Sequence, residues 1–236
     1  MTWSVVAREE KTGAFGVIVS TKAFAVGSLC PFAKSGVGAL ATQALVNVTY
    51  GPRGLRLLGE GVAAEDVVRL LIGADAGQRT RQLHVLDAQG RNAAHTGSDC
   101  VAWCGHLVAD KVSVAGNMLA GPKVIEDTAA AYQRGAGNPF PERLMAAMDA
   151  GQEAGGDKRG RQSAALIVYT SEDYADIDLR VDDHADPLIE LRRLYGVFNG
   201  RAQAFKRCLA TRANPTGIFD REEIEEIIAR AAATAS

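Results

Sequence analysis

The chain has 236 residues, of which 47% are hydrophobic and 23% are charged, and its formal net charge is −2 at pH 7. A chain of this length and composition is typical of a globular protein with a substantial core. The near balance of charge provides no basic surface, so we expect no nucleic-acid partner. No segment approaches the roughly 18 apolar residues that span a bilayer, and the first residues do not read as a secretory signal. We therefore expect a cytoplasmic protein with no membrane partner.

The first predicted elements are two strands. Residues 3–8 and 14–21 are apolar and rich in β-branched side chains, and a polar segment ending in Gly13 separates them. This pattern favours a β-hairpin. Both runs are nearly continuous rather than alternating, which indicates strands that are buried on both faces.

The later elements come in blocks of strands and blocks of helices. Further strands are predicted at 36–42, 82–87, 91–96, 111–116, 163–170 and 177–181. Helices are predicted at 53–59, at 64–74, at 122–154 with a break near 135–139, at 187–209, and after Asp220. This order favours sheets with helices packed outside them over a doubly wound parallel sheet. No linker or repeat is visible, so we expect one domain over 1–236.

Thr2 is the first candidate for catalysis. Methionine is normally removed before a small residue such as threonine, which would leave Thr2 with a free α-amine. An amine with a pKa near 8 can act as the base that activates the hydroxyl of the same residue. If the hairpin turns near residues 11–12, Thr2 pairs with residues near 20–22 and Lys22 lies beside it. A cation there would lower the pKa of the amine and stabilise negative charge. The alternative is that Met1 is retained and Thr2 is an ordinary strand residue.

Two glycine-rich polar segments, 115–121 and 155–163, are candidates for a binding site. Glycines allow the backbone to approach a ligand closely, and arginine suits a planar anion. Asn117 in the first segment is a candidate to donate hydrogen bonds to an amide or a carboxylate. The second segment supplies four candidates for substrate binding: Asp157, Arg161, Gln162 and Ser163. The alternative is a pair of tight turns with solvated charges.

Two other groups of polar residues suggest metal ligands but favour simpler interpretations. The segment 178–184 contains three acids, an arginine and a histidine. A solvated loop is more common for such a run, and we retain Asp183 only as a substrate-binding candidate. His95, Cys100, Cys104 and His106 do not have the spacing of a zinc site. We therefore expect no metal and no cofactor.

Taken together, several segments resemble one family. They are 1–8, 24–28, 41–44 with Asn47, 50–55, 96–98 with Cys100, 116–119, 155–165 and 178–184. They resemble an uncharacterised bacterial family of unknown function in the N-terminal-nucleophile (Ntn) hydrolase superfamily, over residues 1 to about 195. The resemblance implies a four-layer α-β-β-α sandwich, in which two sheets lie between layers of helices. It implies no established reaction.

The resemblance suggests two functions of different classes. Characterised Ntn hydrolases cleave amide bonds with an N-terminal Thr, Ser or Cys, and only Thr2 becomes terminal here by simple removal of Met1. The first function is thus an amide hydrolase in which Lys22 tunes the amine, Asn117 or backbone N–H groups hold the oxyanion, and Arg161 with Asp183 orients a small polar substrate. The second is a non-catalytic module that binds a small polar ligand or assembles as a homo-oligomer. A metal hydrolase that uses 182–184 is a distant third.

Overall fold

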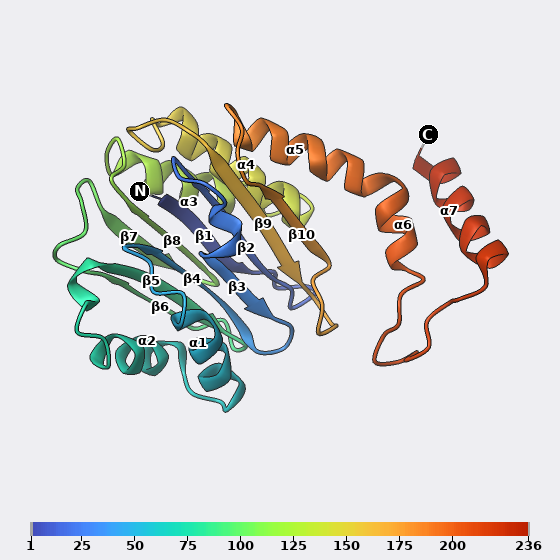
Figure 1. Cartoon of the computed structure of the whole chain (residues 1–236), viewed down its shortest axis with the longest axis horizontal. Coiled ribbons are helices and arrows are strands. Elements are labelled where there is room, and N and C mark those ends of the chain that lie inside the picture. Colours follow the sequence, from blue (N-terminus) through green and yellow to red (C-terminus); the bar gives the residue numbers. More distant parts are fainter. Residues whose placement is uncertain (1, 236) are drawn as a thin grey trace.

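The computed structural model describes residues 2–235, with side chains up to residue 233. Its strands form two antiparallel sheets (Figure 1). The six-stranded sheet has the order β10-β9-β2-β1-β8-β7 and the four-stranded sheet has the order β3-β4-β5-β6. The strands are β1 (Thr2–Arg8), β2 (Phe15–Thr21), β3 (Pro31–Lys34), β4 (Gly38–Ala44), β5 (Arg81–Asp87), β6 (Asn92–Thr96), β7 (Gly105–Ala109), β8 (Val112–Asn117), β9 (Ser163–Tyr169) and β10 (Ile177–Val181).

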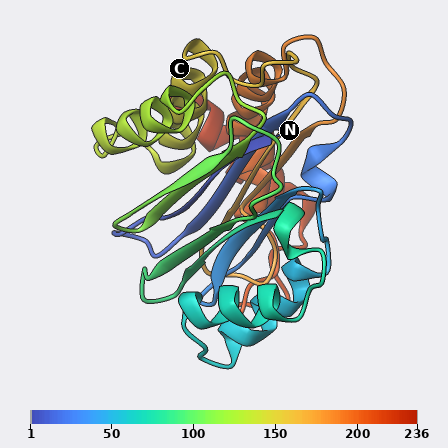
Figure 2. The same ribbon diagram turned by 90° about the vertical axis from the view of Figure 1, so that its left-hand side faces the viewer.

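Helices pack against the outer faces of both sheets (Figure 2). The helices are α1 (Tyr50–Gly59), α2 (Ala64–Gly73), α3 (Lys123–Arg134), α4 (Phe140–Glu153), α5 (Pro187–Val197), α6 (Gln203–Lys206) and α7 (Arg221–Ala235), with short 3-10 segments at Val26–Ser28 and Gln78–Thr80 and a π segment at Phe198–Ala202. Helices α1 and α2 contact the four-stranded sheet, whereas α3, α4 and α5 contact the six-stranded sheet. Among the described residues, no helix is long and apolar enough to cross a membrane.

The two sheets face each other, and the space between them changes in character along the strands. Strands β1 and β2 of one sheet contact β4 and β3 of the other. One part of this interface is an apolar cluster that includes Val6, Val17 and Leu86. The part nearer Thr2 is polar, with the buried side chains of Ser4 and Gln43 hydrogen-bonded to each other. Because successive residues of a strand point to opposite faces, the even-numbered residues of β1 face this interface while Trp3 and Val5 face the helices.

The predicted hairpin is confirmed, including its burial. Strands β1 and β2 pair from Thr2↔Thr21 to Arg8↔Phe15, and nearly every residue in them is buried. The predicted strands at 82–87, 91–96, 163–170 and 177–181 are confirmed as β5, β6, β9 and β10, each within one or two residues. The strand expected at 36–42 lies at Gly38–Ala44, and the one expected at 111–116 lies at Val112–Asn117.

Three expectations about elements need correction. The helix expected at 53–59 begins at Tyr50, and strands β3 and β7 were not predicted. The continuous helix expected at 187–209 is interrupted, because Gly200 has a non-helical backbone with ψ −128°. A glycine is a common site for such a kink.

Candidate active site

Thr2 lies at the start of β1, one of the two central strands of the six-stranded sheet. It pairs with Thr21 on β2 and with Asn117 on β8, and only 8% of its surface is exposed. The pairing with Thr21 falls within the range predicted from the hairpin. Thr2 and Asn117, which are far apart in the sequence, are thus direct neighbours across the β1–β8 ladder.

A small pocket of about 110 Å³ opens beside Thr2. Its wall comes from the end of β2, the loop that follows it and the end of β4, and includes Phe24, Cys30, Gln43 and Ala44. None of its lining residues carries a charge at neutral pH, because burial raises the pKa of the Cys30 thiol far above its usual value. A second hollow of about 290 Å³ also includes Ala44, and Asn117 lies in its wall. Ala44 therefore lies in the wall of both hollows.

Hydrogen bonds fix both the main chain and the hydroxyl of Thr2. The Thr2 carbonyl accepts from Gln43 Nε2 and from Asn117 Nδ2, each at 3.3 Å. The Thr2 hydroxyl donates to Thr21 Oγ1 at 3.2 Å. The position of Thr2 is thus set by two amide side chains and one hydroxyl, all from other strands.

A third amide side chain, that of Gln82, connects the amides of Gln43 and Asn117. Gln82 Oε1 accepts from Gln43 Nε2 at 2.7 Å and from Asn117 Nδ2 at 3.0 Å. Its Nε2 donates to the carbonyl oxygen of Gly116 at 2.9 Å. All three amide side chains are at most 2% exposed. A buried polar network in which every group has a partner is rigid, and removing one member leaves the others unsatisfied.

His84 extends the network to Ser4, two residues along β1 from Thr2. Its Nε2 lies 2.9 Å from Ser4 Oγ and its Nδ1 lies 3.0 Å from Ser113 Oγ. Ser4 has a single hydroxyl proton and donates it to Gln43 Oε1 at 2.7 Å, so His84 Nε2 must be the donor to Ser4. Burial lowers the pKa of His84 to about 3, with a further contribution from His106. The imidazole is therefore neutral at physiological pH and has a defined tautomer.

Three of the four described non-glycine residues with positive φ lie at the same end of the molecule. Ala44 has φ 69°, Met118 has φ 54° and Ala25 has φ 51°, although none of them is glycine. The left-handed conformation costs such residues roughly 1–2 kcal/mol each. Ala44 and Met118 line the hollows beside Thr2. Strain of this kind often accompanies functional sites.

Lys22 lies next to Thr21 in the chain but does not line the pocket. Its side chain is exposed, and Nζ donates to the carbonyl oxygen of Arg161 at 3.2 Å. Its backbone N–H donates to Asp157 Oδ2 at 2.8 Å. Asp157 is buried, and its other oxygen accepts from the N–H of Arg159 at 2.8 Å. Asp157 therefore fixes the chain where it leaves β2.

The other substrate-binding candidates gather around the same loop. Ser163 Oγ donates to the carbonyl oxygen of Ala23 at 2.6 Å and accepts from the N–H of Val26 at 3.1 Å. Gln162 Nε2 donates to Asp183 Oδ1 at 3.1 Å. Arg161 forms an ion pair with Asp186. The structure thus brings Asp157, Arg161, Gln162, Ser163 and Asp183 together, but none of them lines the pocket beside Thr2. They support the loop whose residues Ala23, Phe24 and Val26 form its wall.

Three of the residues nearest the site were not singled out in the sequence. Gln43, Gln82 and His84 are polar side chains within otherwise apolar strands, and Gln82 and His84 are two residues apart. That spacing places both on the same face of β5. Two polar residues on one face of a buried strand were the available signal, but several of their partners lie in the other sheet.

Several of the residues considered as metal ligands form contacts with other groups of the protein. His95 Nε2 contacts the carbonyl oxygen of Gln78 at 3.0 Å, and Cys104 Sγ donates to that of Cys100 at 3.4 Å. Asp178 is paired with Arg180. Within residues 2–235, no group of three or more His, Cys, Asp or Glu side chains could hold a metal ion.

Comparison with known proteins establishes the family. Residues 2–191 match the model of a family of unknown function, DUF1028. The chain is similar to the crystal structure of protein SPO2555 from Silicibacter pomeroyi, described with the same family, at 30% identity and a TM-score of 0.86, over 93% of this chain and 96% of that one. Anbu (ancestral beta-subunit) from Yersinia bercovieri has 13% identity and a TM-score of 0.40, over 83% of this chain and 93% of that one. No curated protein matches. The chain therefore belongs to the DUF1028 family, whose function is unknown.

Proposed function

We propose that this protein is an amide hydrolase of the Ntn type in which Thr2, freed by removal of Met1, is the nucleophile. The observation that carries the proposal is the placement of Thr2. It starts a central strand, lies beside a pocket, and is held by Gln43, Asn117 and Thr21. Met1 itself lies outside the described residues. We also propose that the two sheets and their outer helices are the four-layer α-β-β-α sandwich of this class, folded as one domain.

In the proposed reaction, Thr2 Oγ1 attacks the carbonyl carbon of an amide and the α-amine of Thr2 accepts the hydroxyl proton. The C–N bond then breaks, the proton passes to the leaving amine, and water hydrolyses the ester. Both Nδ2 protons of Asn117 are engaged, one by Thr2 O and one by Gln82. Asn117 therefore positions Thr2 in this arrangement, and it would hold the oxyanion only after releasing one of these contacts. Backbone N–H groups are the alternative donors.

The remaining candidates have supporting roles in this proposal. Lys22 is anchored outside the pocket by Arg161 and Asp157, so its charge acts on the Thr2 amine from a distance. Asp157, Gln162 and Ser163 maintain the shape of the substrate wall. Direct contact of Arg161 and Asp183 with a small polar substrate stays a prediction.

The experiment has two steps. The intact mass of untagged native protein is measured first, and we expect loss of Met1. The protein is then treated with a β-lactone probe that acylates activated hydroxyls, and the modified residue is located by peptide mass spectrometry. We expect modification of Thr2, abolished in Thr2→Ala. Thr21→Val is the matched control, because it removes a hydroxyl from the same pocket without an adjacent α-amine, and it should still be modified. Complete retention of Met1, or equal modification of the Thr2→Ala variant, would contradict the proposal.

A non-catalytic ligand-binding module is the second candidate. It is favoured by the absence of charged groups among the described residues that line the pocket beside Thr2. It predicts a saturable small ligand whose binding is unaffected by retention of Met1. Once a ligand or substrate is found, Thr2→Lys, which keeps Met1, is compared with Thr2→Ala. This comparison separates the two functions.

A further inference from the structure

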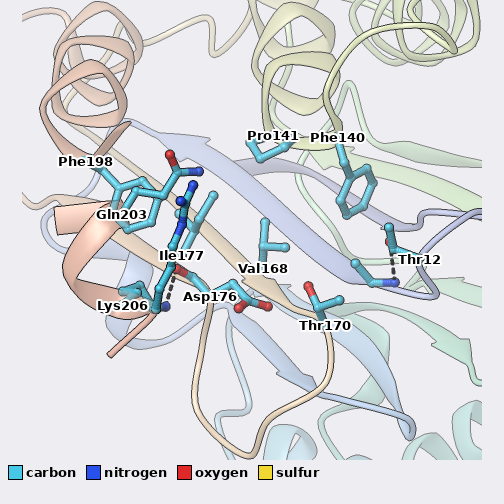
Figure 3. Close-up of a pocket in the computed structure, with 12 residues that line it drawn as sticks. Thr12, Phe140, Pro141, Val168, Thr170, Asp176, Ile177, Phe198, Gln203 and Lys206 are labelled. Carbon is cyan, nitrogen blue, oxygen red and sulfur yellow. Dashed lines mark hydrogen bonds between the residues drawn. The ribbon is translucent and has the colours of Figure 1, made fainter. Parts of the chain in front are cut away.

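A larger hollow lies at the other end of the β1–β2 hairpin from Thr2 (Figure 3). It has a volume of about 390 Å³ and is bordered by the hairpin turn at Thr12, the start of α4, the β9–β10 connection and the segment Phe198–Arg207. Seven residues of strand separate the two ends of β1, which corresponds to roughly 20 Å. This hollow is therefore separate from the proposed active site.

Part of the wall of this hollow is apolar, and its volume suits a small molecule. Phe140 and Phe198 lie on opposite sides of it, with Val168 and Ile177 between them (Figure 3). Pockets for small ligands typically have volumes of 300–1,000 Å³ and combine such walls with a few polar groups.

The carboxylate of Asp176 in the wall has an unsatisfied oxygen. Its Oδ2 is shielded from solvent and has no hydrogen-bond partner among the described residues. The nearby Lys206 Nζ donates to the backbone carbonyls of Ala175 and Asp176 rather than to this oxygen. A buried acceptor without a donor is destabilising. A ligand N–H group that meets this carboxylate as its side chain turns toward the hollow would satisfy it.

Other polar groups in the wall are also unpaired. The exposed side chains of Gln203 and Arg207 and the half-buried side chain of Thr170 form no hydrogen bond with any residue that the structure describes, and all three line the hollow. The guanidinium of Arg207 suits a carboxylate, to which it can donate two parallel hydrogen bonds. Lys206 adds a second positive charge, so the wall contains one carboxylate and two cations.

We propose that this hollow binds an apolar α-amino acid. The ligand ammonium group donates to the Asp176 carboxylate, its carboxylate pairs with Arg207, and its side chain lies between Phe140 and Phe198. An α-amino acid is the smallest common molecule that has a donor, an anion and an apolar body together. The proposal does not depend on the function of Thr2, because the two sites share no residue.

The test is a calorimetric titration of the full chain with L-phenylalanine and L-leucine, together with two analogues that each lack one charge. Phenethylamine has no carboxylate and 3-phenylpropionate has no ammonium group. We expect saturable binding of both amino acids, and at least about tenfold weaker binding of each analogue, which corresponds to about 1.4 kcal/mol. We expect Asp176→Asn and Arg207→Gln to weaken binding of L-phenylalanine at least as much. Arg69→Gln, on the exposed side of α2, is the matched control and should bind normally.

A second measurement keeps the test valid if a variant fails to fold. Methyl NMR signals of Val168 and Ile177 in the wild-type protein should shift on titration with L-leucine, whereas those of Val67, on the buried face of α2, should not. Absence of binding by the wild type, or 3-phenylpropionate binding as tightly as L-phenylalanine, would overturn the proposal. Thr2→Ala should leave this binding unchanged, so the two proposals fail independently.

Discussion

Gln43 illustrates how single residues hold the proposed site. Its Nε2 donates to Thr2 O, to Gln82 Oε1 and to the carbonyl oxygen of Ala115, while its Oε1 accepts from Ser4. One side chain from the four-stranded sheet therefore fixes strands β1 and β8 of the other sheet. Its contribution is to the geometry at Thr2 as much as to stability.

Replacement of Gln43 by leucine should cost stability because its partners lose their hydrogen bonds in a buried site. We expect Gln43→Leu to lower the free energy of unfolding by about 2–4 kcal/mol, measured by urea denaturation. Gln133→Leu is the control, since Gln133 is exposed on α3, and it should change stability by less than about 0.5 kcal/mol. Equal stability of the two variants would show that the network contributes little.

His84 should make stability depend on pH. Its pKa in the folded protein, about 3, lies below its ordinary value of 6.5 because the imidazole is buried. The unfolded chain therefore binds a proton that the folded chain does not, and stability falls as the pH drops from about 6.5 toward 3. The slope is about 1.4 kcal/mol per pH unit for one group. We expect His84→Gln to reduce this slope between pH 6 and 4, whereas His184→Gln at an exposed site should retain it.

The sequence allowed part of this site to be predicted. The hairpin spacing placed Thr2 opposite residues near 20–22, and its partner is Thr21, because the register of a hairpin follows from its turn. The contacts of Gln43 with the carbonyl oxygens of Thr2 and Ala115 depend instead on how the two sheets align. That alignment is set by packing over the whole interface, and no local pattern in the sequence encodes it.

The packing of α4 on β2 shows how elements depend on small residues. A Cβ added to Gly16 would lie 2.6 Å from Leu144 Cδ1 and 2.8 Å from the Phe140 ring. Glycine here is required by the close approach of the helix and the strand. The sequence suggested a buried strand at this point, but it did not reveal which helix covers it.

Gly16→Ala should therefore overpack this contact. We expect a loss of about 1–3 kcal/mol in the free energy of unfolding, measured by chemical denaturation. Gly121→Ala is the matched control, because a Cβ at Gly121 would meet no atom within 4 Å. If both variants are equally stable, the helix and strand have room to separate.

Strands β3 and β7 were missed for different physical reasons. Strand β3 has four residues and begins with Pro31, which weakens the local signal for a strand. Strand β7 lies at the edge of its sheet and its residues alternate between half-buried and exposed, without a strongly apolar side. Both are held in place mainly by their neighbours β4 and β8.

At the scale of the whole molecule, the C-terminal helix α7 lies apart from the sheets (Figure 1). Its main contacts are with α6 and the π segment, and Arg201 forms a bidentate ion pair with Glu225. Helix α5 differs, because Leu188 and Leu191 are part of the core against the six-stranded sheet. The family match also ends in α5, at residue 191.

Deletion of residues 219–236 should therefore leave the body of the protein folded. We expect the thermal midpoint to fall by only a few degrees, about the effect of 1 kcal/mol in a protein of this size. Deletion from residue 187 onward is the contrasting variant, and it should prevent cooperative folding because it removes α5 from the core. A chain that unfolds after the shorter deletion would show that α7 supports the sheets.

The order of strands in the six-stranded sheet has a consequence for synthesis of the chain. Strands β1 and β2 emerge first, yet their outer partners β8 and β9 end only at Asn117 and Tyr169. At about 5–20 residues per second, the second partner follows roughly 7–30 s after the hairpin. During that interval two apolar strands have open edges, which is when they are most prone to aggregate or to need a chaperone. The same interval is when an aminopeptidase has the freest access to the start of the chain, before Thr2 is buried between Thr21 and Asn117.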